Sequence, residues 1–175
     1  MWLLLQEADN KLLRLFNNRL SCPFLDKLLP LLTHLGSAGG TISIVLSTLA
    51  TGYALQINTY YQAGINASVA LLACSFVIQV IKKIINRPRP QLMLEGLRAF
   101  NVPICPYSFP SGHTGASLTI ALVIAHYLPL FGAILIALSC LIGFSRIYLG
   151  VHYLSDVVAG GLIGTLVSML IIYLI

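Results

Sequence analysis

The segment SRIYLGVHYLSD places three ionisable residues, Arg146, His152 and Asp156, between two long apolar runs. Residues four apart on a helix share a face, so Asp156 can hold one nitrogen of the His152 imidazole. The other nitrogen is then free to act as a nucleophile. Ionisable groups beside membrane spans are costly and usually functional. The structural alternative is a polar network that joins neighbouring helices.

A second polar group, FPSGHTGAS, opens the apolar run at residues 111–128. Pro110 and Ser111 are good helix starters. A helix N-terminus offers free N–H groups and a positive dipole end, which suit a phosphate. Gly112 would let a ligand approach the backbone closely, and His113 could donate a proton there. The plainer interpretation is an ordinary helix cap with a histidine near the membrane interface.

A third group, KKIINRPRP, follows the apolar run at residues 65–85. Pro88 disfavours a helical conformation at Arg87, so the helix is predicted to end just before it. Lys82 and Arg89 could then point to one place from the helix end and the loop. For Lys83 and Arg87 we expect side chains that extend to lipid headgroups.

Together the three groups supply several cations, a helix N-terminus and two histidines. Guanidinium groups bind phosphate through two parallel hydrogen bonds. Phosphoryl transfer requires cations for the equatorial oxygens, a nucleophile and an acid. The sequence therefore predicts a site for a phosphoryl group. With only five acidic residues in the chain, a two-metal phosphatase is disfavoured, and no metal or cofactor is expected.

The order K-x6-RP, PSGH and SR-x5-H-x3-D closely resembles the type 2 phosphatidic acid phosphatase superfamily, over about residues 30–175. The resemblance implies that His152 is the nucleophile and forms a phosphohistidine, with Asp156 orienting it. His113 would protonate the leaving oxygen and then help to activate water. The phosphate would be held by Lys82, Arg89, Ser111, Gly112 and Arg146.

Composition sets the class of protein. The chain has 175 residues, of which 58% are hydrophobic and 9% charged, against about 25% charged in soluble domains. A span needs roughly 20 mostly apolar residues. The sequence predicts a single all-α domain, an integral-membrane bundle with five clear spans at about residues 38–57, 65–85, 111–128, 133–147 and 154–175. The net charge of +5 favours anionic lipid headgroups over nucleic acid, because the basic residues form no single run.

Residues 1–37 are predicted to lie outside this five-span core of residues 38–175. Glu7 and Asp9 interrupt the apolar start of the chain, so it does not fit a cleavable signal peptide. Basic residues alternate with apolar ones at Lys11, Arg14 and Arg19, which favours an amphipathic helix in the membrane interface up to about residue 18. The alternative is a sixth span.

Five crossings place the N-terminal segment, the 86–110 loop and the 146–153 turn on one side of the membrane. Every Lys and Arg falls on that side, and the other side carries no charge. The positive-inside rule, applied to the N-terminal Lys11, Arg14, Arg19 and Lys27, puts this face in the cytoplasm. The family resemblance implies the opposite, an active site on the outer face of a bacterial cytoplasmic membrane.

The leading functional hypothesis is a lipid phosphatase, with the substrate's tails in the bilayer. Undecaprenyl diphosphate is the favoured substrate because the loops are small, and phosphatidylglycerophosphate, phosphatidic acid and lipid A phosphates are the alternatives. The same residues would also serve a lipid phosphotransferase. A vanadium haloperoxidase has a similar site, but five membrane spans argue against one, and the intact motifs argue against a non-catalytic channel.

Two further expectations concern packing. The four cysteines, Cys22, Cys74, Cys105 and Cys140, form no CxxC pair and are interpreted as small buried hydrophobic residues. The spacing of Gly160, Gly161 and Gly164 indicates close helix packing, within the bundle rather than across a dimer.

Overall fold

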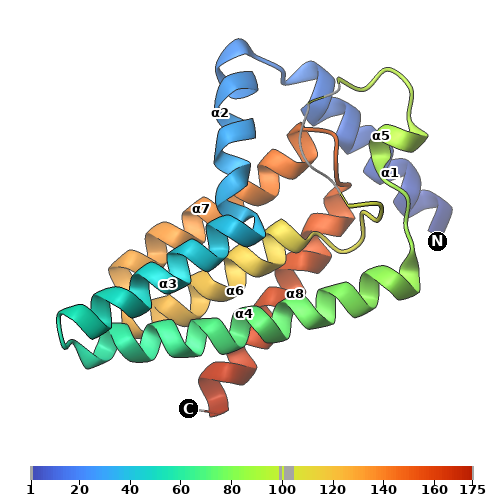
Figure 1. The fold of residues 1–175 in the computed structure, drawn as a ribbon. Coiled ribbons are helices and arrows are strands. Elements are labelled where there is room, and N and C mark those ends of the chain that lie inside the picture. The colour runs from blue at the N-terminus through green and yellow to red at the C-terminus, as the bar shows by residue number, and fades with distance from the viewer. Residues whose placement is uncertain (1, 99, 101–104, 175) are drawn as a thin grey trace.

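The computed structural model describes residues 2–98, 100 and 105–174, and this part of the chain is helical with no strand. Helix α6 lies inside the bundle and packs against the other four long helices (Figure 1). The five long helices are α3 (Ala38–Ala54), α4 (Asn58–Ile85), α6 (Gly112–Tyr127), α7 (Pro129–Tyr148) and α8 (Leu154–Leu174). The shorter helices α1 (Trp2–Arg14), α2 (Pro23–Thr33) and α5 (Pro90–Met93) gather at one end of the bundle. The predicted all-α class is confirmed.

Two helices begin earlier than predicted, α4 at Asn58 and α7 at Pro129. The connections before them are short because small residues let neighbouring helices approach closely. A Cβ on Gly52 would lie 2.3 Å from the backbone nitrogen of Tyr61, and one on Gly132 would lie 2.1 Å from Cα of Ala125. Each pair of helices therefore forms a tight antiparallel hairpin.

Not every long helix meets the ordinary requirement for a span. Among the described residues, α4, α7 and α8 are long and apolar enough to cross a membrane. Helices α2 and α3, which are bent by 60° relative to each other, would form a fourth span if the pair counts as one. Helix α6 has only 16 residues. It is surrounded by the other four long helices. The protein is a membrane protein, and the count of five spans stays a prediction.

The N-terminal segment is helical as predicted, and α1 continues through a π-helical turn, Leu15–Arg19. Asp9, Leu13 and Asn17 are buried on one face of this helix, as their four-residue spacing requires. The Asn17 side-chain amide donates to the carbonyl of Tyr148 over 2.8 Å. This face therefore packs against the protein, and the interfacial location of the opposite face stays a prediction.

Glycines on α8 bring it into backbone contact with α6. A Cβ on Gly160 would lie 2.4 Å from the carbonyl oxygen of Ser111, and one on Gly164 would lie 2.7 Å from that of Gly115. The predicted close packing within the bundle is confirmed. It places the first turn of α6 directly beside the first turns of α8.

Replacing Gly160 by Ala should destabilise the protein, because the new methyl group would overlap the Ser111 carbonyl and force α6 and α8 apart. The expected loss is about 1–3 kcal/mol. Gly161→Ala is the matched control, since its Cβ would meet nothing nearer than 3.8 Å. Thermal unfolding in detergent measures both, and an equal melting temperature for the two variants would contradict this packing.

Candidate active site

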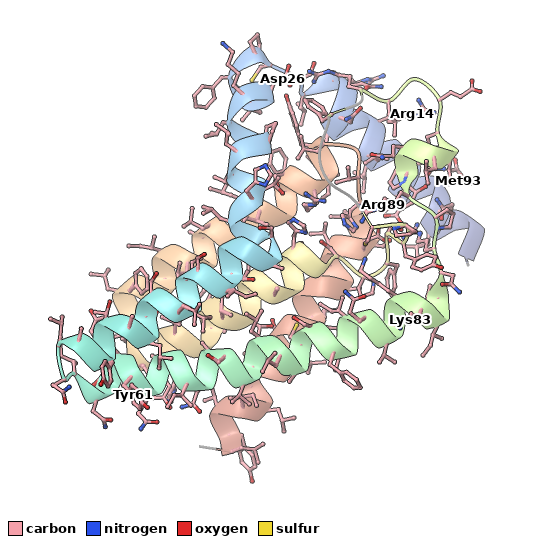
Figure 2. All side chains as sticks on the ribbon, viewed as in Figure 1. Arg14, Asp26, Tyr61, Lys83, Arg89 and Met93 are labelled. Carbon is pink, nitrogen blue, oxygen red and sulfur yellow. The ribbon has the colours of Figure 1, made fainter. Side chains whose placement is uncertain are left out.

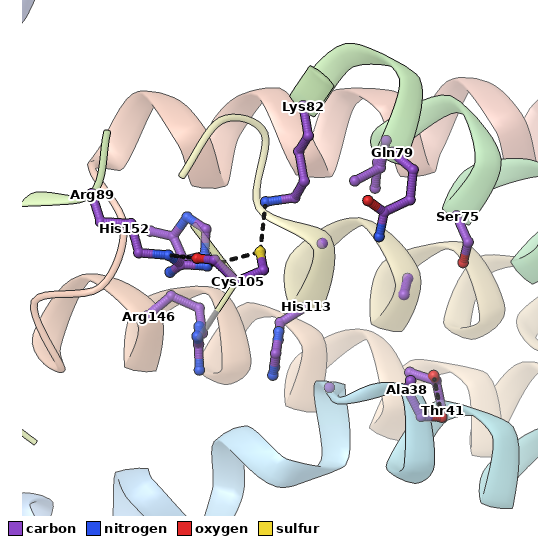
Figure 3. Close-up of a pocket in the computed structure, with 14 residues that line it drawn as sticks. Ala38, Thr41, Ser75, Gln79, Lys82, Arg89, Cys105, His113, Arg146 and His152 are labelled. Atoms are coloured by element: carbon purple, nitrogen blue, oxygen red, sulfur yellow. Dashed lines mark hydrogen bonds between the residues drawn. The ribbon is translucent and has the colours of Figure 1, made fainter. Parts of the chain in front are cut away.

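A cavity of about 250 Å³ opens where α4, α6 and α7 meet the loops at the N-terminal end of α8. Figure 3 shows side chains from distant parts of the sequence around it, and Figure 2 places Arg89 between the bundle and the short helices. Six of the eight predicted site residues line it: Lys82, Arg89, Gly112, His113, Arg146 and His152. The three sequence groups therefore converge on one place.

Three of the lining residues are buried cations. Lys82, Arg89 and Arg146 are 5%, 2% and 1% exposed. Their hydrogen bonds go to neutral acceptors: Nζ of Lys82 donates to the Tyr107 carbonyl over 2.9 Å, and Nη1 of Arg146 donates to Thr33 over 2.8 Å. None of the three forms an ion pair with a carboxylate in the described part of the chain.

Buried charges of one sign are costly unless a counter-ion joins them. Nε of Arg146 is buried and finds no hydrogen-bond acceptor within the described residues. The cavity is thus suited to an anion with several oxygens, which is the geometry that guanidinium groups recognise.

His152 lies at the edge of this cation cluster. Nη1 of Arg89 is 3.3 Å from Nε2 of His152, and an arginine N–H can only donate. Nε2 is therefore the acceptor, which leaves the proton on Nδ1. That nitrogen faces Oδ2 of Asp156 at 3.5 Å. The arrangement exposes a lone pair toward the cations and keeps a carboxylate behind the ring.

The charge state of His152 follows from the same surroundings. Burial, and then the positive charges of Arg146, Arg89 and Lys82, lower the pKa of His152 well below its ordinary value. At neutral pH the imidazole is therefore uncharged in the empty site. A neutral imidazole is the nucleophilic form.

Ser111 and Asp156 do not line the cavity but lie behind its wall. Ser111 is fully buried. Its hydroxyl caps α6 by accepting from the backbone N–H of Thr114 over 3.5 Å, and it also pairs with the Thr114 hydroxyl at 2.9 Å. Its backbone N–H donates to the Asp156 carbonyl over 2.9 Å. These residues hold the first turns of α6 and α8 together. The role of Ser111 at the phosphate stays a prediction.

Arg87 is placed differently from the sequence-based expectation. It does not extend to lipid headgroups: it is 8% exposed and forms ion pairs with Asp9 and Asp156, each shorter than 3 Å. Its guanidinium also lies over the ring of Tyr153. The prediction was wrong because the partner Asp9 is 78 positions away, on a helix whose docking the local sequence does not indicate.

Cys105 also departs from its expected role. It is exposed at the cavity, where its Sγ lies 3.6 Å from Nζ of Lys82 and 3.2 Å from Nη2 of Arg89. Partial burial raises the pKa of the Cys105 thiol, but the charges of Lys82 and Arg89 outweigh it and hold the pKa below the ordinary value. Cys140 is exposed too, and Cys74 is buried as expected.

A helical membrane bundle with a cation-lined cavity and two histidines defines an enzyme that acts on phosphate groups of membrane molecules. The family model of the PAP2 superfamily matches residues 63–175, and the chain belongs to this superfamily. It is a PAP2-type membrane lipid phosphatase.

Relatives and solved structures agree with that assignment. Phosphatidylglycerophosphatase B of Bacillus subtilis is 27% identical over 160 residues, which cover 85% of this chain and 74% of the relative. Undecaprenyl-diphosphatase of Sulfolobus acidocaldarius is 33% identical over 109 residues, 57% of this chain and about half (51%) of the relative. The crystal structure of a transmembrane PAP2-type phosphatidylglycerolphosphate phosphatase from Bacillus subtilis matches with a TM-score of 0.80 and 26% identity, covering 97% of this chain and 85% of that one.

The position of Cys105 gives a test of the anion site. Its thiol lies among the cations and its pKa is lowered, so iodoacetamide should label Cys105 faster than the half-buried Cys22 at pH 7. Inorganic phosphate should slow the labelling of Cys105 alone, because it occupies the same cations. Mass spectrometry of tryptic peptides reads both sites, with Cys105→Ser as the blank. If inorganic phosphate leaves the labelling rate of Cys105 unchanged, that result would argue against an anion site here.

Proposed function

We propose that the protein removes the terminal phosphate from undecaprenyl diphosphate through a phosphohistidine on His152, without a metal ion. The observation that carries the proposal is the set of three buried, carboxylate-free cations beside the imidazole of His152. The cations would bind the three free oxygens of the terminal phosphate. Nε2 of His152 would then stand in line with the phosphorus.

The first step transfers the phosphoryl group. Nε2 of His152 attacks phosphorus, the bond from phosphorus to the bridging oxygen breaks, and the lipid monophosphate leaves. His113, in the first turn of α6 and lining the same cavity, donates a proton to the leaving oxygen. Asp156 stabilises the positive charge that develops on the His152 ring.

The second step restores the enzyme. Water attacks the phosphorus of the phosphohistidine, His113 accepts its proton, and the nitrogen–phosphorus bond breaks to release inorganic phosphate. Lys82, Arg89, Arg146 and the N–H groups at Gly112 hold the phosphate in both steps. Ser111 contributes through the cap that fixes this helix end. A lipid phosphotransferase would differ only in replacing water by another acceptor.

The shape of the cavity supports a lipid substrate. From the cations it extends past Gln79 and Ser75 on α4 to Thr41 and Ala38 on α3 (Figure 3). The volume suits a phosphate and its linkage, and leaves little room for a large headgroup. This favours undecaprenyl diphosphate, in line with the name of one relative. Phosphatidylglycerophosphate is the second candidate, because a relative that matches 85% of the chain is named for it.

We place the active site on the outer face of the membrane, as the resemblance implies. The opposing argument applies the positive-inside rule to the N-terminal Lys11, Arg14, Arg19 and Lys27, and four further basic residues on that side do not add to it. Lys82, Arg87, Arg89 and Arg146 are buried in or behind the site, where the chemistry itself requires positive charge. They therefore carry little information on orientation.

Release of inorganic phosphate from purified lipids tests this function. The panel is undecaprenyl diphosphate, phosphatidylglycerophosphate, phosphatidic acid and lipid A phosphate, each with EDTA present. We expect phosphate release to continue in the presence of EDTA. The highest kcat/KM should be for undecaprenyl diphosphate. Loss of turnover in EDTA that Mg²⁺ restores would overturn the metal-free mechanism, and a higher kcat/KM for another lipid would overturn the substrate assignment.

His113→Ala should lower kcat on phosphatidic acid, whose alcohol leaving group needs a proton, by about 10²–10⁴-fold, the usual contribution of a general acid. The loss should be smaller on a nitrophenyl phosphate, whose leaving group needs no proton. His126→Ala, at the far end of α6, is the matched control and should leave both rates unchanged. An equal loss on the two substrates would contradict the role of His113 as the acid.

A further inference from the structure

A buried charge network connects the N-terminal helix to the back of the candidate active site. The guanidinium of Arg87 donates from Nη1 to Oδ1 of Asp156 over 2.7 Å, and from Nη2 to Oδ2 of Asp9 over 2.8 Å. All three side chains are less than one-tenth exposed. One cation thus bridges two carboxylates out of contact with solvent.

The two oxygens of Asp156 have separate partners. Oδ1 is held by Arg87, whereas Oδ2 accepts from the backbone N–H of Tyr153 over 2.9 Å and faces Nδ1 of His152. The bond to Arg87 therefore fixes the rotation of the carboxylate. If Arg87 were absent, the carboxylate would lose one of these two fixed points, and Oδ2 would be held less firmly toward the imidazole.

Asp9 is anchored as firmly as Asp156. Its carboxylate accepts from the backbone N–H of Ser155 over 3.0 Å and also from the Ser155 hydroxyl. These bonds cap the first turn of α8 from outside, at the residue next to Asp156. The carboxylate therefore belongs to the wall behind His152, although it lies near the start of the chain.

The charges explain why a second carboxylate is present. Arg87 alone would neutralise Asp156 and weaken its ability to stabilise a positive imidazole. With Asp9 on the same guanidinium, the group of two carboxylates and one cation keeps one net negative charge behind His152. In a buried setting such a charge acts strongly over short distances.

We propose that Asp9 and Arg87 are positioning residues of the phosphatase: Arg87 sets the orientation of Asp156, and Asp9 restores the negative charge that Arg87 would otherwise cancel. The N-terminal helix is then part of the catalytic apparatus and not only a membrane-surface element. This inference rests on the proposed roles of His152 and Asp156.

The test compares Asp9→Asn with Glu7→Gln in steady-state hydrolysis of nitrophenyl phosphate and of the lipid substrate. Glu7 lies on the same helix in an exposed pair with Lys11, so its variant controls for loss of a carboxylate there. We expect Asp9→Asn to lower kcat about 10- to 100-fold, as loss of an outer hydrogen-bonding partner typically does. KM should stay within about twofold, because the cations that bind phosphate are untouched.

The pH profile separates a positioning role from a structural one. The charged or titratable groups facing His152 are Asp156 from α8, Arg146 from α7, Lys82 from α4, His113 from α6 and Arg89 from the loop. Removing the negative charge of Asp9 disfavours protonation of His152, so the acid limb of kcat/KM should move to lower pH. If Asp9→Asn only lowered the stability of the protein, its melting temperature would fall but the acid limb of kcat/KM would stay at the same pH.

Arg87→Lys and Asp9→Glu complete the set. Lysine keeps the charge but cannot bridge two carboxylates in a fixed fork, so kcat should fall. Asp9→Glu keeps the charge and should retain more activity than Asp9→Asn, and it carries the test if Asp9→Asn fails to fold. Equal kcat and pH profiles for Asp9→Asn and Glu7→Gln in an active enzyme would overturn the inference. An inactive wild-type protein would instead overturn the proposed function.

Discussion

The burial of three cations without a carboxylate partner is the constraint on which the rest of the structure depends. Lys82, Arg89 and Arg146 come from a helix end, a loop and another helix end, and each is held by neutral oxygens. Such charges are unfavourable in a membrane protein unless hydrogen bonds and a counter-ion compensate them, and a rigid backbone is needed to keep them together. The close contact of α8 with α6 and the tight helix hairpins provide that rigidity.

Two layers of opposite charge lie on either side of His152. The cations in front lower the pKa of His152 and attract a phosphate. The Asp9–Arg87–Asp156 group behind it is net negative and can compensate a positive ring. A histidine between these layers is uncharged when the site is empty and better able to carry charge once an anionic substrate has arrived. In the proposed mechanism this geometry would link substrate binding to activation of His152.

The sequence predicted those parts of the site that rest on local spacing. Lys82 and Arg89 converge because Pro88 ends a helix, and His152 meets Asp156 because the two are four residues apart. Long-range partners were missed. Asp9 and Arg87 are joined only through the docking of α1, and Cys105 reaches the cations through the fold of a loop. Ser111 was expected at the phosphate from the family resemblance, and in this structure its hydroxyl pairs with Thr114.

The central claim is that the phosphoryl group passes through His152. Rapid quenching of the purified enzyme with phosphorus-labelled lipid, under conditions that preserve acid-labile phosphohistidine, tests it most directly, followed by peptide mass spectrometry. The account predicts label on the peptide that contains His152, none in His152→Ala, and normal labelling in His126→Ala. Label that persists in His152→Ala, or that resides on His113, would contradict it.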